Sequence, residues 1–349
     1  MKERILEHLA CPACRGLLDM DVISRDGDEI MEGRLECSTC HLGYAVQRGV
    51  PRLLPPHLSP EKAKTARAFG WEWTNYVEMH TEYEEQFLDW VYPLRPEFFQ
   101  RKLVLDAGCG IGRHAYFAAR YGAREVIGLD LSAAVETSFR NFGRLPNAHV
   151  VQGDIYWPPF RKDANGGEFD FVYTIGVLHH LPNPRAGFES LLSVVRPGGT
   201  IFAWVYGHEN NGLVHNFINP LRKWVTTRLP HGVVNAMSLP LAVVLQGLVK
   251  GVYRPLHGTE FFKRLPSHAY LYSLSRFGFR QNLSIVFDHL IAPTAFYLKQ
   301  DEFENWFVEN GLEDIEISWR NENSWRGRGH VTTRTLSNRH AMIGAPSHA

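Results

Sequence analysis

The sequence has no excess of charge of either sign, because its 37 Lys and Arg residues balance 37 Asp and Glu residues. Its first residues also lack the long apolar run that a secretory signal needs, so we expect a cytoplasmic protein. Hydrophobic residues make up 44% of the 349-residue chain and charged residues 21%, a balance typical of soluble globular proteins. Together these features exclude a disordered or fibrous chain.

Cysteine is scarce, and four of the five cysteines stand in two C-x-x-C pairs. Cys11, Cys14, Cys37 and Cys40 form the pattern C-x2-C-x22-C-x2-C, in which each pair offers two sulfurs from one tight turn to a tetrahedral zinc ion. In a reducing compartment, such pairs favour metal thiolates over disulfides. We predict a structural zinc site without an open coordination position; a redox dithiol pair, an iron site and a site without metal are the alternatives.

The segment around these cysteines resembles a known family. From "ILEHLACPACRGLL" through "LECSTCHLGYAVQRGVPRLLP" it is similar to the small zinc-ribbon proteins that partner and activate RNA and protein methyltransferases. It also resembles the ribbon in front of some bacterial ribosomal RNA guanine methyltransferases. The resemblance implies a zinc-ribbon domain over residues 1–56, and the proline-rich, then charged residues 51–68 predict a linker into a helix.

Residues 57–100 are predicted to form this linker and a helical aromatic cover. The stretch "FGWEWTNYVEMHTEYEEQFLDWVYPL" is denser in Trp and Tyr than a connector needs. Either its rings pack on amphipathic helices, or some of them cover a bound ligand. The rings in question are Trp71, Trp73, Tyr76, Phe87 and Trp90.

A glycine turn opens an alternation of strands and helices. "KLVLDAGCGIGRHAYFAARYG" predicts an apolar strand, a turn at residues 108–112 and a helix to about Ala119. Further strands are predicted at "EVIGLDLS", "AHVVQGDIY" and "FDFVYTIGVLHHL", and "SLLSVVRPGGTIFAWVYG" predicts a helix, a Pro-Gly-Gly turn and a fifth strand. This alternation predicts a parallel sheet with right-handed crossovers, whose ligands bind at the carboxyl ends of the strands.

The motifs "LDAGCGIGR", "GLDLS", "QGDIY" and "RPGG" occur in an order that resembles S-adenosylmethionine-dependent methyltransferases of the Rossmann-like, class I type. The resemblance implies an α/β fold with a mostly parallel Rossmann-like sheet and an antiparallel closing hairpin, behind the zinc ribbon and with a helical lid insertion. It implies S-adenosylmethionine as cofactor. The predicted parts are a cofactor-binding core at 101–207, the lid at 208–292, and a C-terminal helix with closing strands at 293–349.

Three acids and the glycine turn form the predicted cofactor site. Asp130, at the end of the second strand, is placed to accept hydrogen bonds from both ribose hydroxyls. Asp154 is placed to accept one from the adenine amino group, while Ile155 packs on the ring. Asp106 either orders the turn and approaches the methionine amino group or only caps the turn. The predicted cofactor-binding residues are Asp106, Gly108, Cys109, Gly110, Gly112, Asp130, Leu131, Asp154, Ile155 and Gly176.

Methyl transfer from a sulfonium depends mainly on positioning, and it needs a base only if the nucleophile arrives protonated. The fourth strand ends at "IGVLHHLPNP", which places His179 and His180 at the edge of the sheet. We predict both as candidate catalytic residues, with His180 ahead of His179, because histidine accepts a proton near neutral pH. The alternative is that "LHHL" is scaffolding shared by methyltransferases with dissimilar substrates.

The insertion at 208–292 delays the helix "KQDEFENWFVENGL" and the strands "EDIEISW" and "HVTTRTL", which the family pattern would place directly after the fifth strand. It carries nine Lys or Arg residues against three acids. This excess indicates an anionic group on the substrate, or else solvated faces of lid helices. The polar loop "WRNENSWRGRG" either rims the site or forms an exposed hairpin turn.

The insertion also holds "VVNAMSLPLAVVLQGLV", residues 233–249, whose apolar residues gather on one helical face. At about seventeen residues, interrupted by Pro240, it is marginal for crossing a bilayer, so we predict no transmembrane segment. It is either a buried lid helix or a helix that contacts lipid or a lipid-linked substrate.

These features favour a methyltransferase that acts on an oxygen or nitrogen of a small molecule, with anionic, sugar-containing and lipid-linked acceptors all open. An RNA base methyltransferase that holds RNA with its ribbon is the first alternative, although residues 1–50 are not strongly basic. A non-catalytic regulatory protein with the cofactor fold is the second alternative.

Overall fold

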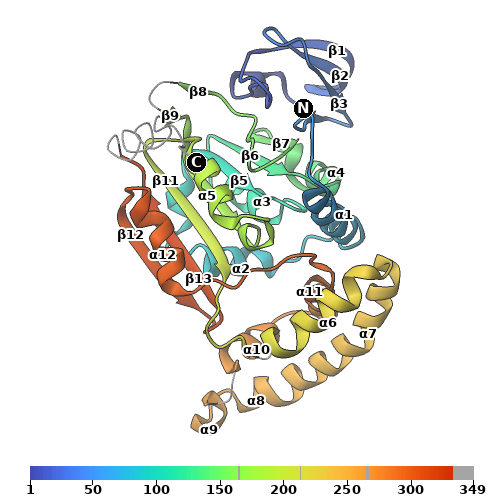
Figure 1. Ribbon diagram of the computed structural model, residues 1–349, viewed down its shortest axis with the longest axis vertical. Helices are drawn as coiled ribbons and strands as arrows, with labels where there is room; N and C mark the ends of the chain where they lie inside the picture. The colour runs from blue at the N-terminus through green and yellow to red at the C-terminus, as the bar shows by residue number, and fades with distance from the viewer. Residues whose placement is uncertain (164–165, 213, 265–266, 333–349) are drawn as a thin grey trace, which may run out of the picture.

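The computed structural model describes residues 1–163, 166–212, 214–264 and 267–332 (Figure 1). Eleven strands of these described residues form one sheet, and two short strands, β8 (Lys162–Asp163) and β9 (Gly166–Gly167), pair separately. The order across the large sheet is β1 (Leu18–Asp26), β2 (Glu29–Cys37), β3 (Gly43–Gln47), β4 (Val50–Leu53), β7 (Ala148–Gly153), β6 (Glu125–Asp130), β5 (Leu103–Ala107), β10 (Phe169–Ile175), β11 (Val195–Tyr206), β13 (Ser324–His330) and β12 (Glu313–Arg320).

The centre of the sheet is parallel and its far edge is antiparallel. Strands β4, β7, β6, β5, β10 and β11 run parallel to one another, whereas β13 runs antiparallel to β11 and to β12. The sequence-based prediction of a mostly parallel Rossmann-like sheet with an antiparallel closing hairpin is therefore confirmed.

Successive side chains of a strand point to opposite faces of the sheet, so the apolar central strands need a cover on both faces. Helices supply this cover. Leu103 and Leu105 of β5 join a core with α5 (Pro184–Leu192) and α12 (Gln300–Glu309), whereas Val104 faces α2 (Tyr83–Trp90) and α3 (Arg113–Arg120). Helix α4 (Ala134–Ser138) lies on the second face. Helix α1 (Pro60–Asn75) begins at Ser59, whose Oγ accepts the Lys62 amide hydrogen bond and so caps the helix.

The ribbon is part of the same sheet. Strand β4 pairs antiparallel with β3 of the ribbon and parallel with β7, where Arg52 lies opposite Gln152 and Leu53 opposite Gly153. Ile5 and Leu35 of the ribbon are fully buried in the same apolar core as Val151. The ribbon thus extends the sheet beyond β7 instead of hanging from a free linker.

Two expectations for the late part of the sheet are wrong. The closing strand lies earlier than "HVTTRTL": β13 is Ser324–His330, so all but its last residue fall in the segment predicted as a polar loop. Val331 and Thr332 follow the strand, and 333–336 lie outside the described residues. The glycines of this segment let α12 approach, because a Cβ at Gly327 would lie 2.7 Å from the Phe307 ring. The Pro-Gly-Gly segment is an irregular stretch within β11 and not a turn before it.

The described part of the insertion is helical, as predicted. It forms a layer at the end of the molecule opposite the ribbon (Figure 1). Helix α11 packs against both α1 and α7, through a small core of Ala68, Val234, Phe287 and Leu290. The helices of this layer are α6 (Asn219–Trp224), α7 (His231–Leu248), α8 (Arg254–Leu256), α9 (Glu260–Lys263), α10 (His268–Leu274) and α11 (Phe279–Ile291).

Helix α7 is not a buried lid helix. Of the described helices, the continuous helical stretch His231–Leu256 is the one that is long and apolar enough, by length and composition, to cross a membrane. Only 22% of its most apolar 18-residue stretch is buried. A large part of its apolar surface therefore faces outward.

Candidate active site

The four paired cysteines converge as predicted. Their Sγ atoms all lie within 4.8 Å of one another, with 3.7 Å between Cys11 and Cys40 and 3.4 Å between Cys14 and Cys37. Four sulfurs bound tetrahedrally to zinc at ~2.3 Å are about 3.8 Å apart, so this cluster fits a structural zinc ion. The exposed His41 is not part of the cluster.

A cavity of about 650 Å³ lies at the carboxyl ends of the parallel strands, within the range of small-molecule sites. Asp106, Gly112 and His179 do not line it, although the sequence marked them as site residues. The structure brings the other predicted cofactor and catalytic residues together in its wall: Gly108, Cys109, Gly110, Asp130, Leu131, Asp154, Ile155, Gly176 and His180.

The turn after β5 needs glycine at two positions for different neighbours. Gly108 has φ +86°, and a Cβ there would lie 2.3 Å from the Val177 side chain. Gly112 has φ +81°, and a Cβ there would lie 2.4 Å from the Phe142 ring. Gly108 therefore leaves the turn without a side chain beside the cavity, whereas Gly112 lets the start of α3 pack against Phe142.

Asp130 is fixed by three hydrogen bonds. Its Oδ2 accepts one from the Gly110 amide at 2.9 Å, and its Oδ1 accepts two from the Ser132 amide and hydroxyl at 2.8 and 2.7 Å. Burial raises the pKa of Asp130, while these hydrogen bonds oppose the rise. The carboxylate is thus held rigidly between the glycine turn and the cavity.

Asp154 has a partner that the sequence did not reveal. Its Oδ1 accepts a hydrogen bond from the Tyr156 amide at 2.9 Å, and its Oδ2 forms an ion pair with Lys62 Nζ at 2.5 Å. Lys62 belongs to the first turns of α1 and also lies over the Tyr156 ring, 4.9 Å from its centre. Helix α1 is therefore tied to the predicted adenine side of the site.

Asp106 sits in β5, almost completely buried. Its Oδ2 has no hydrogen-bond partner among the described residues, and burial raises the pKa of Asp106 to about 7. Asp106 does not line the cavity, and its approach to the methionine amino group stays a prediction.

The two neighbouring histidines occupy different environments. His180 lines the cavity, and its Nδ1 lies 2.7 Å from the Thr294 carbonyl oxygen. Since a carbonyl only accepts, Nδ1 carries the hydrogen and Nε2 keeps its lone pair. Burial lowers the pKa of His180 to about 4, although the nearby Asp288 opposes this. His179 is fully buried outside the cavity wall and stacks on Tyr206 at 3.8 Å.

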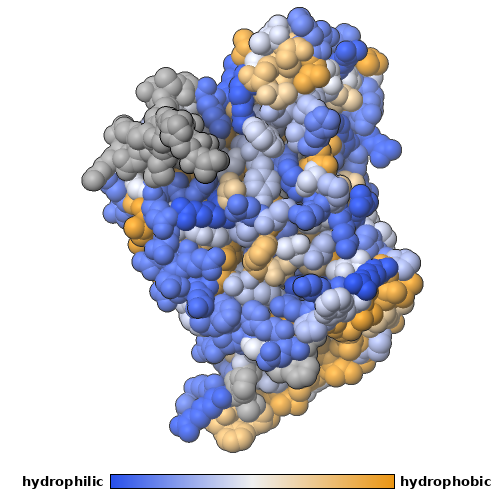
Figure 2. Space-filling view, in the orientation of Figure 1, coloured by the Kyte–Doolittle hydropathy of each residue, from blue (hydrophilic) through white to orange (hydrophobic). Residues whose placement is uncertain are grey.

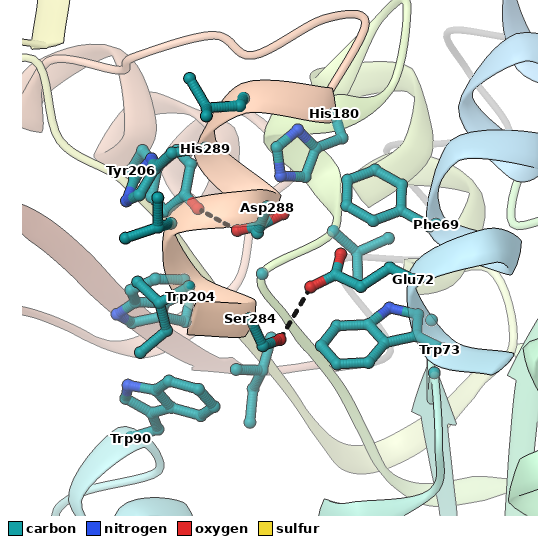
Figure 3. Close-up of a pocket in the computed structure, with 18 of the residues that line it drawn as sticks. Phe69, Glu72, Trp73, Trp90, His180, Trp204, Tyr206, Ser284, Asp288 and His289 are labelled. Carbon is teal, nitrogen blue, oxygen red and sulfur yellow. Dashed lines mark hydrogen bonds between the residues drawn. The ribbon is translucent and has the colours of Figure 1, made fainter. Parts of the chain in front are cut away.

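Two carboxyl groups face the same space as His180, and sequence reasoning missed both (Figure 3). Glu72 of α1 is fully buried; its Oε1 accepts a hydrogen bond from Ser284 Oγ at 2.9 Å, and its Oε2 has no partner among the described residues. Burial and the nearby Asp288 raise the pKa of Glu72 well above its usual value. Asp288 of α11 accepts a hydrogen bond from the Tyr206 hydroxyl at 3.2 Å. The available signal was an acid set among aromatic residues in "FGWEW" and "VFDHL".

Some rings of the aromatic segment before the core line the cavity and others pack on helices, so both predicted roles occur. Trp73 and Trp90 line the cavity, whereas Phe87 is fully buried against other rings. Trp71 and Tyr76 instead pack on Phe287 of α11, at 4.9 and 6.0 Å between ring centres. Phe69, the first residue of this segment, also lines the cavity, and further rings come from later in the chain: Trp204, Tyr206, Tyr270, Phe277 and Tyr297.

Two family models match the chain at the parts described above. Residues 105–203 match the methyltransferase domain, and residues 2–49 match the Trm112p-like proteins. The chain carries a class I S-adenosylmethionine-dependent methyltransferase domain. Its N-terminal part is a Trm112p-like zinc ribbon with a four-cysteine cluster.

Relatives of the methyltransferase domain include proteins with dissimilar names. The ubiquinone biosynthesis O-methyltransferase of Dictyostelium discoideum is 30% identical over 28% of this chain and 33% of its own. The tRNA U34 carboxymethyltransferase of Hahella chejuensis is 30% identical over 38% of this chain and 35% of its own. The magnesium protoporphyrin IX methyltransferase structure from Synechocystis PCC 6803 shares 14% identity over 80% of this chain and 90% of that one, with a TM-score of 0.37. The chain thus spans about a third of the length of these curated relatives.

The cations of the insertion do not lie in the cavity of the methyltransferase domain. Two other arginines do line it, Arg113 of α3 and Arg320 of β12. The predicted anionic group on the substrate therefore has no cation of the insertion in this cavity wall, and it stays a prediction. The nine residues are Arg222, Lys223, Arg228, Lys250, Arg254, Lys263, Arg264, Arg276 and Arg280.

Proposed function

We propose that the protein transfers a methyl group from S-adenosylmethionine to an oxygen or nitrogen of a small, largely apolar acceptor. The observation that carries the proposal is one cavity with two unlike parts. One part is lined by the glycine turn, Asp130 and Asp154, and the other by aromatic rings with His180, Glu72 and Asp288.

The residues at the sheet edge suit the cofactor. The turn presents Gly108 and Gly110 without side chains, so a ligand can approach the backbone there. Asp130 offers its carboxylate to the ribose hydroxyls, and Asp154 offers its own to the adenine amino group beside Ile155. When bound, the cofactor supplies an activated methyl group to a nucleophile that is aligned with the carbon–sulfur bond.

His180 is the proposed proton acceptor for an acceptor hydroxyl or amine. Its hydrogen bond to the Thr294 carbonyl fixes the ring and leaves Nε2 as the basic atom. Its low pKa keeps the ring neutral at physiological pH, so the lone pair is available. The Asp288 carboxylate, which raises the His180 pKa, stabilises the imidazolium after it takes the proton.

Glu72 is the proposed hydrogen-bond donor that orients the acceptor. Its raised pKa keeps the side chain protonated, and Ser284 already occupies Oε1. Buried polar atoms are nearly always hydrogen-bonded, so the unpartnered Oε2 is available for a polar atom of a bound molecule. The remaining wall is mainly aromatic and aliphatic, which favours a flat or apolar acceptor body.

The test is to incubate the protein with methyl-labelled cofactor and fractionated cell extract. We expect the label in small molecules that partition into organic solvent. Label in RNA would instead support an RNA base methyltransferase; the name of the Hahella chejuensis relative, a tRNA U34 carboxymethyltransferase, also points to an RNA substrate for that protein. Cofactor binding without label transfer to any fraction would support a non-catalytic, regulatory protein.

A further inference from the structure

One face of helix α7 exposes a row of apolar side chains. Figure 2 shows this apolar surface along the edge of the molecule where Figure 1 places α7. Val244 is 70% exposed and Val243 57%. A large contiguous apolar patch on a protein surface usually marks an interaction site. We name it the α7 face; its members are Val233, Met237, Leu239, Leu241, Val243, Val244 and Leu248.

The polarity of α7 is reversed compared with a surface helix of a soluble protein. Its three uncharged polar side chains all bond within the protein: Asn235 Oδ1 accepts from the Tyr76 hydroxyl at 2.6 Å, Ser238 Oγ donates to the Val234 carbonyl at 2.9 Å, and Gln246 Oε1 accepts from Asn282 Nδ2 at 2.6 Å. A surface helix normally turns its polar side chains outward. The outward side of α7 therefore suits an apolar medium and not water.

Four cations flank α7 in the sequence, and we call them its cationic rim. Lys223 and Arg228 precede α7, and Lys250 and Arg254 follow it. Between residues 223 and 264 the sequence has one acid, Glu260, which pairs with Lys263 at 2.7 Å. An apolar helix face flanked by cations is the pattern of helices that lie in the interface of anionic membranes.

An exposed aromatic side chain lies among the cations that precede α7. Trp224 is 61% exposed, and Lys223 and Arg228 lie over its ring at 5.8 and 5.6 Å. Tryptophan beside lysine and arginine is typical of residues at the level of lipid headgroups. An apolar face whose neighbouring sequence carries many cations and one acid matches the charge of an anionic phospholipid surface.

We propose that the α7 face and its cationic rim bind the surface of a membrane that contains anionic phospholipids. The helix lies along the membrane and does not cross it, because Val234, Ser238 and Ala242 on its other side are buried in the insertion, where α11 packs. Leu241 and Leu245 of α7 also line the cavity, so the cavity lies beside the lipid surface. On the function proposed above, this arrangement favours an acceptor that resides in the membrane.

The test is flotation of the full-length protein with vesicles, which does not depend on methyl transfer. We expect binding to phosphatidylcholine vesicles that contain phosphatidylglycerol, and binding at least about tenfold weaker to phosphatidylcholine alone. The double variant Val243→Asp/Val244→Asp should lose at least about tenfold in binding, because two charges replace apolar contacts. The double variant Lys250→Gln/Arg254→Gln should bind both kinds of vesicle more nearly alike.

The matched control is Val308→Asp, which places the same change at an exposed valine of α12 and should bind vesicles like the wild type. Melting temperatures close to the wild-type value establish that each variant is folded. The proposal is overturned if the wild type does not float with anionic vesicles, or if Val243→Asp/Val244→Asp floats as well as the wild type. It is also overturned if light scattering shows a dimer that this double variant dissociates, or if the face proves to bind RNA instead of vesicles.

Discussion

The two ends of the cavity differ in the distance along the chain over which they are built. The cofactor end is local: Asp130 is reached by the Gly110 amide from 20 residues away and by Ser132 from 2 residues away. The acceptor end is assembled by packing: Glu72 and Ser284, 212 residues apart, meet where α1 lies against α11. Short motifs therefore specify most of the first end, whereas the second end depends on how α1 and the insertion helix α11 pack together at the sheet edge.

The largest expected effect is a loss of cofactor affinity at the cofactor end of the cavity. Asp130→Ala should weaken binding of S-adenosylmethionine by at least about 100-fold, because two charge-assisted hydrogen bonds of ~1.5–3 kcal/mol each are lost. Titration calorimetry measures this change. Ser132→Ala, which keeps the carboxylate, is the control and should bind within about threefold of the wild type. A loss of less than about threefold in Asp130→Ala would mean that the turn, and not the carboxylate, holds the cofactor.

The second prediction separates the two ends. His180→Ala should lower kcat by about 100-fold and leave cofactor affinity unchanged, since a general base contributes roughly 10²- to 10⁴-fold. With a pKa of about 4, His180 is unprotonated above that pH, so the His180-dependent rate should be flat from pH 6 to 8 and fall only as the pH approaches 4. His57→Ala, at an exposed position, is the control. An unchanged kcat in His180→Ala would exclude the base role.

The third prediction tests the protonation state of Glu72. The folded protein holds this proton well above pH 4.5, whereas the unfolded chain releases it near that value, so wild-type stability should fall as pH rises above 4.5. Glu72→Gln removes this dependence and should become the more stable protein toward pH 8, with acceptor KM within about threefold of the wild type. Denaturant unfolding over this pH range checks it, with Glu61→Gln on the same helix as control. Parallel pH curves for wild type and Glu72→Gln would contradict the assignment.

A substitution in the ribbon should have the smallest effect on ligand binding at either end of the cavity. Cys37→Ser should abolish zinc binding and lower the melting temperature by about 5–10 °C, because metal binding contributes directly to folding. Cofactor affinity should change by less than about twofold, since no cysteine of the cluster lines the cavity. Metal analysis, calorimetry and thermal melts check the three parts. A large loss of cofactor affinity would mean that the ribbon acts on the cavity through β4 and β7.

The same contrast decides what the sequence could predict. Short apolar runs and the glycine turn predicted the central strands and the positions of Asp130 and Asp154, and the two C-x-x-C pairs predicted the cysteine cluster, because these features depend on nearby residues. Lys62, Glu72 and Asp288 could not be predicted, since their roles arise from how α1 and α11 pack on the sheet edge. The closing strand was missed because the arginines and glycines of β13 look like a polar loop in the sequence. The glycines are needed because α12 packs closely against this strand.

The most direct measurement is a crystal structure of the protein with S-adenosylhomocysteine, the product that the proposed reaction would leave behind. The account predicts the ribose hydroxyls at hydrogen-bond distance from Asp130, the adenine beside Asp154 and Ile155, and the sulfur facing the space shared by His180, Glu72 and Asp288. Nucleoside density elsewhere, or a sulfur directed away from that space, would contradict it.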